Sequence, residues 1–204
     1  MFENRLANII SYIFHPLMMP TYVMILFFNM NVYYTYIIAD YSKLRIIGLV
    51  FITTFLFPLL INLVFLRHRL ISTLHMKIRE ERMLPFIVTG VFYYMTYHLI
   101  KQLFLPDFYK LYLLGATLLV LIALTINFFR KISLHLLAIG GVTGIFMGLS
   151  FKLMLEIHYL IISLIFISGL VGYARLKMDV HRPYEIYGGY LIGFAVMFLL
   201  FIFL

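Results

Sequence analysis

The stretch HLLAIGGVTGIFMGLSFKLML occupies residues 135–155, and its only ionisable side chains are His135 and Lys152. About 20 predominantly apolar residues are enough for an α-helix to cross the hydrocarbon core of a bilayer. Six other segments are comparably apolar, at roughly 17–39, 46–66, 85–104, 111–129, 158–173 and 187–204. The sequence therefore predicts an all-α protein, a polytopic transmembrane helix bundle with six or seven spans.

The first of these segments is the least regular. A short amphipathic stretch, residues 5–14, precedes it and ends in a break at His15-Pro16, and Pro20 and Asn29 to Asn31 interrupt the segment further. An amphipathic helix can lie in the membrane interface without crossing the bilayer. The sequence therefore leaves open whether the chain crosses six or seven times.

Composition places the whole chain in the membrane. Of its 204 residues, 64% are hydrophobic and 12% are charged, whereas a soluble domain is about half apolar and about a quarter charged. No linker or low-complexity stretch interrupts this pattern, so we expect a single integral membrane domain over residues 1–204, in a multi-pass membrane protein. The sequence has no cysteine, which excludes disulfides and thiolate chemistry.

The formal net charge is +8. The basic residues fall in short loops between spans and not on one soluble face, which argues against a nucleic-acid partner. Either the cytoplasmic bias of Lys and Arg or phosphate binding explains the charge. Even-numbered loops together with Arg5 hold 11 of the 16 Lys and Arg. Phosphate binding would equally explain six of these 11, which are Lys77, Arg79, Arg82, Lys131, Arg175 and Arg182. The charge asymmetry therefore leaves the orientation of the chain in the membrane open.

Three loops carry most of the polar residues that could bind a ligand or take part in catalysis. They are RHRLISTLHMKIREERML at 67–84, RKISL at 130–134 and ARLKMDVHRPYEI at 174–186. With seven spans these are the second, fourth and sixth loops, so they lie on the same face of the membrane. The sequence therefore predicts that they meet at one end of the bundle, where Lys77, His135 and His181 would share one phosphate group.

The residue types in these loops match the needs of phosphoryl transfer. Arg and Lys stabilise the charge on the transferred group. A neutral histidine can attack phosphorus and form a covalent intermediate, and a nearby carboxylate can fix its tautomer. A second histidine can protonate the leaving oxygen. Two histidines, a carboxylate, several cations and a hydroxyl supply a candidate for each role.

The spacing of these residues resembles the motifs of the type 2 phosphatidic acid phosphatase family of membrane phosphatases. The third family motif is Ser-Arg, five residues, His, three residues, Asp, and this chain has Ala174-Arg175, His181 and Glu185 at the same spacing. The second motif, Pro-Ser-Gly-His, corresponds to Ile132-Ser133-Leu134-His135. The first, Lys, six residues, Arg-Pro, is matched loosely by Lys77, Arg82 and Pro85. The resemblance covers residues 77–189 and implies a lipid-phosphatase-like core.

The resemblance implies a role for each matching residue. His181 would be the nucleophile that forms phosphohistidine, Glu185 would orient it in place of the family's Asp, and His135 would be the general acid. The phosphate-binding residues would be Lys77, Arg82, Arg175 and Ser133, with Arg79 and Lys131 as further cations. The implied activity is metal-independent hydrolysis, without a cofactor, of a phosphate mono- or diphosphate ester on a lipid. Phosphatidic acid, phosphatidylglycerol phosphate, a polyprenyl diphosphate and phosphorylated lipid A all fit this description.

Other functions remain open on the sequence alone. A catalytically silent relative would bind or move anionic lipids, and a small transporter would carry an anion. A metal site made of His135, His181 and Glu185 is the less favoured chemistry, because the surrounding cations would repel a divalent ion and suit a phosphate instead.

Overall fold

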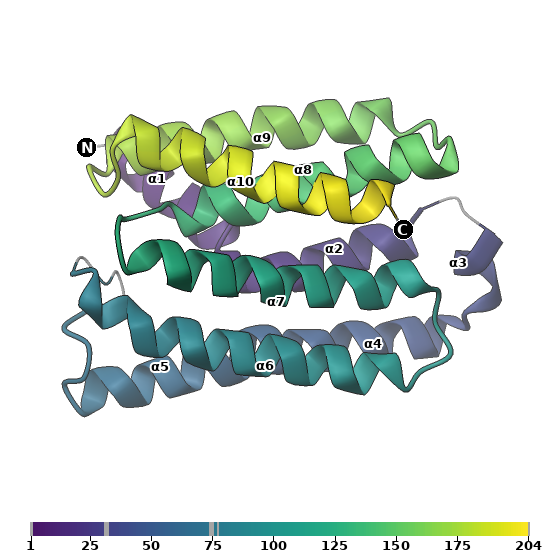
Figure 1. Ribbon diagram of the computed structural model, residues 1–204, viewed down its shortest axis with the longest axis horizontal. Helices are drawn as coiled ribbons and strands as arrows, with labels where there is room; N and C mark the ends of the chain where they lie inside the picture. Colours follow the sequence, from purple (N-terminus) through teal and green to yellow (C-terminus); the bar gives the residue numbers. More distant parts are fainter. Residues whose placement is uncertain (1, 31–32, 74–75, 77, 204) are drawn as a thin grey trace. The chain divides into compact units, whose positions relative to one another are not determined.

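The computed structural model describes residues 2–30, 33–73, 76 and 78–203, and these residues are helical with no strand among them (Figure 1). Seven helical segments are long and apolar enough to cross a membrane. The predicted all-α polytopic bundle is therefore confirmed, and the chain is an integral, multi-pass membrane protein. The segments are Arg5–Phe28, Asp40–Arg67, Glu80–Lys101, Asp107–Asn127, Leu134–Leu153, His158–Lys177 and Pro183–Ile202.

The helices follow one another through short connections. In chain order the elements are α1 (Phe2–Ile13), η1 (Pro16–Met18), α2 (Met19–Phe28), α3 (Tyr33–Ile37), α4 (Asp40–Phe51), η2 (Ile52–Leu56), α5 (Phe57–Arg67), η3 (Glu80–Arg82), α6 (Met83–Lys101), α7 (Asp107–Asn127), α8 (Leu134–Leu153), α9 (His158–Lys177) and α10 (Pro183–Ile202). The π-helical η2 joins α4 to α5, so that these three elements form one span.

The first span differs from the predicted 17–39. It runs over Arg5–Phe28, because the break at His15-Pro16 is only a short turn of helix, η1, and the helical path continues through it. Pro16 is the first residue of η1. A backbone N–H at this position has no partner within the helix, so the lack of one in proline costs nothing.

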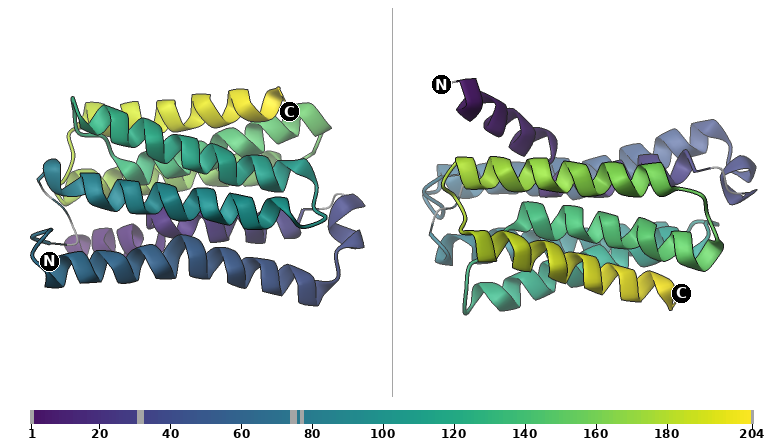
Figure 2. Two further views of the ribbon diagram at one scale, coloured as in Figure 1. Left: turned by 60° about the horizontal axis from the view of Figure 1, so that its bottom comes forward. Right: turned by 90° about the horizontal axis from the view of Figure 1, so that it is seen from above.

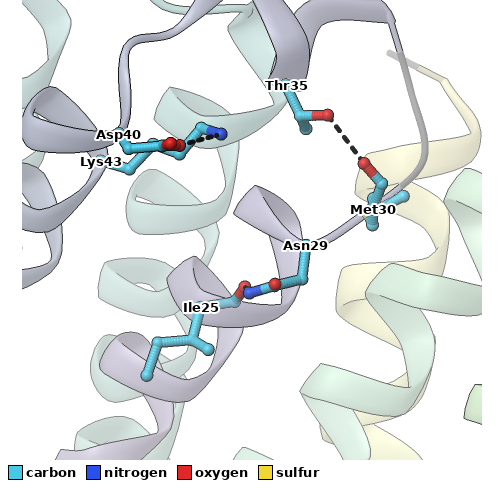
Figure 3. Close-up of polar contacts among 6 residues, drawn as sticks. All are labelled: Ile25, Asn29, Met30, Thr35, Asp40 and Lys43. Atoms are coloured by element: carbon cyan, nitrogen blue, oxygen red, sulfur yellow. Dashed lines mark hydrogen bonds and ion pairs between the residues drawn. The ribbon is translucent and has the colours of Figure 1, made fainter.

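Polar contacts surround the end of α2, where the first span stops. The side-chain amide of Asn29 donates to the carbonyl of Ile25 at 2.8 Å, and the hydroxyl of Thr35 on α3 donates to the carbonyl of Met30 at 2.8 Å (Figure 3). The carbonyl of Ile25 also accepts the N–H of Asn29 at 3.2 Å, so these side chains add polar contacts at the place where the helix ends. The following helix, α4, starts beyond this turn with the exposed ion pair between Asp40 and Lys43, 2.9 Å long (Figure 3).

The described chain divides into two compact units. Unit 1 comprises Met1–Met19 and Thr125–Leu204, and unit 2 comprises Pro20–Leu124. Unit 2 holds α2 from Pro20 onwards, α3 to α6, and α7 as far as Leu124. Within it, the hydroxyls of Thr53 in η2 and Thr96 in α6 lie 2.8 Å apart and are buried. Whether residues 1–204 make one domain stays a prediction.

Unit 1 is built on a close contact between α8 and α10. A Cβ on Gly140 would overlap the carbonyl of Tyr190, and a Cβ on Gly144 would overlap that of Phe194. One turn further along, a Cβ on Gly148 would lie 2.8 Å from the Cβ of Phe201. Glycines four residues apart therefore let one helix backbone rest directly on the other, as small residues do in membrane helix pairs.

Glycines of α10 extend the same contact towards its first turn. A Cβ on Gly189 would lie 2.8 Å from the carbonyl oxygen of Ser133, and one on Gly193 would overlap the carbonyl of Leu137. The start of α10 thus faces the start of α8, and their far ends also face each other, so the two helices are parallel. The antiparallel α9 connects them, and Figure 2 shows the three helices as neighbours in its right-hand view.

This contact predicts different outcomes for two glycines of one helix. We expect Gly193→Ala to lower the free energy of unfolding by about 1–3 kcal/mol, the usual cost of overpacking. Gly188→Ala is the matched control, because no described atom lies within 4 Å of its Cβ position. It should raise stability by up to about 1 kcal/mol through helix propensity. Thermal unfolding in detergent measures both, and equal shifts for the two variants would contradict the packing described here.

Candidate active site

The turn between α9 and α10 brings the third-motif residues together. Asp179 adopts a left-handed conformation with φ 52°. Its N–H donates to the carbonyl of Leu176 at 2.9 Å, and the N–H of Val180 donates to that of Arg175 at 3.4 Å. These two bonds make a Schellman motif, which ends a helix and reverses the chain. Six residues after Arg175, the chain therefore returns with His181.

His181 and Glu185 form a short, buried hydrogen bond. The Nδ1 of His181 lies 2.7 Å from the Oε2 of Glu185, and the two side chains are 4% and 7% exposed. A carboxylate only accepts, so Nδ1 carries the donated proton, and the Nε2 of a neutral His181 presents its lone pair. Glu185 stands in the first turn of α10, where the helix dipole stabilises its negative charge.

A backbone hydrogen bond joins the second-motif loop to this pair. The N–H of Ser133, just before α8, donates to the carbonyl of Glu185 at 3.2 Å. The hydroxyl oxygen of Ser133 is buried and has no hydrogen-bond partner among the residues that the structure describes. A buried hydroxyl in this state is costly. The predicted role of Ser133 as a donor to phosphate stays a prediction.

His135, in the first turn of α8, is held by the N-terminal segment. Its Nε2 lies 3.1 Å from the carbonyl oxygen of Ser11, which can only accept, so the histidine donates through Nε2. His135 is buried and close enough to Arg175 and His181 to interact with both electrostatically. Two histidines and one arginine of the predicted set therefore share one buried cluster, together with Glu185.

Arg175 supplies the buried positive charge of this cluster. It lies in the last turn of α9 and is 7% exposed. Burying a charge is expensive unless it is paired or meets a charged ligand, so a buried arginine at the end of a membrane helix is a candidate for a functional residue. The guanidinium can hold a phosphate through two parallel hydrogen bonds. The first turns of the parallel helices α8 and α10 add positive dipole ends at the same level.

The cations of the second loop are placed differently. Lys77 lies outside the described residues. Arg79 pairs with Glu80 at 3.4 Å, and the buried Arg82 donates from Nε to the carbonyl of Met76 at 2.9 Å. Both arginines belong to unit 2, whereas the cluster belongs to unit 1, so their phosphate-binding role stays a prediction. Lys131 belongs to unit 1 and is exposed just before α8, and its phosphate-binding role also stays a prediction.

Sequence analysis missed one histidine of the cluster. The rings of His15 and His135 make an edge-to-face contact, with centroids 5.7 Å apart and planes at 81°. His15 also interacts electrostatically with Arg175, and its Nδ1 accepts the N–H of Leu17 at 3.3 Å. In the sequence His15 only marks a break before Pro16, because nothing local shows that α1 packs beside α9.

Neither metal ligation nor known relatives add to this picture. Among the described residues, no three His, Asp or Glu side chains are grouped so that they could hold a metal ion. No protein-family model, no curated protein and no solved structure matches the chain.

The turn itself generates a stability prediction. Left-handed backbone costs a residue with a Cβ roughly 1 kcal/mol, and glycine avoids this cost. Asp179 is exposed, so little else changes when its side chain is removed. We expect Asp179→Gly to raise the unfolding free energy by about 0.5–1 kcal/mol, and Asp179→Ala, which keeps a Cβ, to give no such gain. Thermal unfolding in detergent compares the two, and a gain with alanine as large as with glycine would contradict the explanation.

Proposed function

We propose that this chain is a membrane-embedded lipid phosphatase, which hydrolyses a phosphate mono- or diphosphate ester of a lipid through a phosphohistidine intermediate. The observation that carries the proposal is the buried contact of 2.7 Å between His181 and Glu185, with Arg175 six residues before His181 across a tight turn. The pair orients a nucleophile, and Arg175 provides the charge that holds a phosphoryl group.

The reaction proceeds in two steps. In the first, Nε2 of His181 attacks phosphorus, an N–P bond forms and the ester P–O bond breaks. His135, protonated on both ring nitrogens, gives one proton to the leaving oxygen and becomes neutral. Glu185 stabilises the positive charge that develops on the His181 ring. In the second step His135 takes a proton from water, the water oxygen bonds to phosphorus, and the N–P bond breaks. Phosphate leaves, and both histidines return to their starting states.

The location of the cluster supports a lipid substrate. Its residues lie at the ends of membrane-crossing helices: Arg175 in the last turn of α9, His135 and Glu185 in the first turns of α8 and α10. A lipid can present its phosphate at this level while its acyl or prenyl tail stays in the bilayer. Phosphatidic acid, phosphatidylglycerol phosphate, a polyprenyl diphosphate and phosphorylated lipid A are the substrates to compare.

The paired carboxylate favours catalysis over binding alone. A protein that only binds or moves an anionic lipid needs cations, but has no need for an imidazole whose tautomer is fixed by a buried carboxylate. A small anion transporter would need polar groups along a path across the bilayer. Lipid binding without release of phosphate would identify the silent lipid-binding protein, and ion-coupled flux in proteoliposomes would identify the transporter.

The first test of the proposal is release of inorganic phosphate from the four lipids by purified protein in detergent with EDTA. We expect release from at least one lipid and a labelled, acid-labile phosphohistidine after rapid quenching. His181→Ala should abolish both signals. The control is His158→Ala, at the other end of α9, which should match the parent. A His181→Ala variant as active as the parent would overturn the mechanism.

The length of the carboxylate side chain gives a second test. Glu185 reaches Nδ1 of His181 from four residues away, with both side chains buried. Aspartate is one methylene shorter, and misplacing a reacting group by about 1 Å can cost up to about 100-fold in rate. We expect Glu185→Asp to lower kcat about tenfold and Glu185→Gln to lower it about 100-fold or more, because the amide does not stabilise the imidazolium. Unchanged kcat in Glu185→Gln would exclude the orienting role.

A further inference from the structure

The N-terminal helix is anchored beside the candidate active site. α1 packs against α9, and over residues 5–13 of the helix, whose burial the structure describes, the buried positions are the small residues Ala7 and Ser11, four residues apart. The hydroxyl of Ser11 lies 3.4 Å from the sulfur of Met178, the residue that ends α9. Small residues at this spacing allow two membrane helices to approach closely. The backbone of Ser11 is therefore brought to the end of α9 where the third-motif turn begins.

This anchoring holds His135 by two contacts. The carbonyl oxygen of Ser11 accepts from Nε2 of His135 at 3.1 Å, and the ring of His15 makes the edge-to-face contact at 5.7 Å. A carbonyl on one ring nitrogen decides which nitrogen carries the proton of the neutral imidazole. Because the carbonyl takes Nε2–H, Nδ1 becomes the nitrogen that can gain or lose a proton. The ring of His15 hinders a flip of the His135 ring, which would put Cε1 in place of Nε2 at the carbonyl of Ser11.

We propose that residues 11–15 are the positioning element for His135, and that they make Nδ1 its proton-transfer atom. The role in turnover rests on the proposed phosphatase function. Ser11 acts through its backbone carbonyl and His15 through its ring, and neither exchanges a proton with the substrate. In this arrangement both histidines of the reaction are oriented by an acceptor, His181 by a carboxylate on Nδ1 and His135 by a carbonyl on Nε2.

A direct measurement of the tautomer tests the positioning without any substrate. The parent protein is labelled with ¹⁵N-histidine in detergent, and the ring signals of His135 are assigned by their loss in His135→Asn. Imidazole nitrogens with and without a proton have well-separated shifts. We expect protonated Nε2 and unprotonated Nδ1 for neutral His135. A dominant Nδ1–H form in the parent would overturn the proposal.

Two substitutions of His15 separate ring packing from its local hydrogen bond. His15→Phe keeps a ring against His135 and loses the acceptor for the N–H of Leu17, whereas His15→Asn keeps an acceptor and loses the ring. We expect His15→Asn to let both tautomers of His135 be populated and to lower kcat about tenfold with little change in KM. His15→Phe should retain the Nε2–H form and lose less than threefold in kcat. The opposite order would mean that His15 only caps η1, and would overturn its positioning role.

A second pair of variants tests the carbonyl of Ser11. Ala7→Leu adds bulk to the α1 face that contacts α9, so it should move Ser11 away and release the tautomer of His135. Asn8→Leu introduces the same side chain at the neighbouring exposed position and should leave the ¹⁵N signals as in the parent. Thermal unfolding shows whether each variant is folded. An unchanged His135 tautomer in folded Ala7→Leu would show that Ser11 does not set it.

The two readouts keep the proposals apart. If the parent releases no phosphate from any of the four lipids, the phosphatase function fails, and the ¹⁵N spectra still decide whether residues 11–15 orient His135. If phosphate is released but the tautomer and kcat are indifferent to His15→Asn and Ala7→Leu, the positioning role fails and the phosphatase stands.

Discussion

The direct backbone contact between α8 and α10 is the constraint on which the candidate site depends. Glycines on both helices remove the side chains that would otherwise separate them, from Gly189 near the start of α10 to Gly148 near the end of α8. Because the helices are parallel, their first turns lie at one level, and the N–H of Ser133 can reach the carbonyl of Glu185. The two histidines of the proposed reaction therefore lie close together because glycines leave no side chains between α8 and α10.

Hydropathy alone was enough to predict the spans, because a bilayer demands long apolar helices whatever their partners are. It was wrong for the first span, which already ends at Phe28 and upstream includes α1 in spite of the extended residue His15. The residues at which a helical span begins and ends depend on local contacts, which hydropathy averaged over many residues does not register. The choice of helix partners was also beyond such averages.

The candidate site was predictable where its geometry is local. His181 and Glu185 are four residues apart at the start of one helix, so their spacing in the sequence carries over to space. The meeting with His135 requires the fold, and the contribution of Ser11 and His15 depends on α1 packing against α9, for which the sequence has no local sign. The cations of the second loop depend on the fold as well, because Arg82 bonds the carbonyl of Met76 through Nε and its phosphate-binding role stays a prediction.

The short turn after α9 constrains the number of residues between α9 and α10. Only residues 178–182 separate the last residue of α9 from the first of α10. The left-handed conformation of Asp179 further restricts the path of the backbone through this turn. One inserted residue adds about 3.3 Å of reach, more than the whole distance between the imidazole and its carboxylate. Natural variation of this segment should therefore leave its length untouched, while the exposed Asp179 can change more readily than the buried His181.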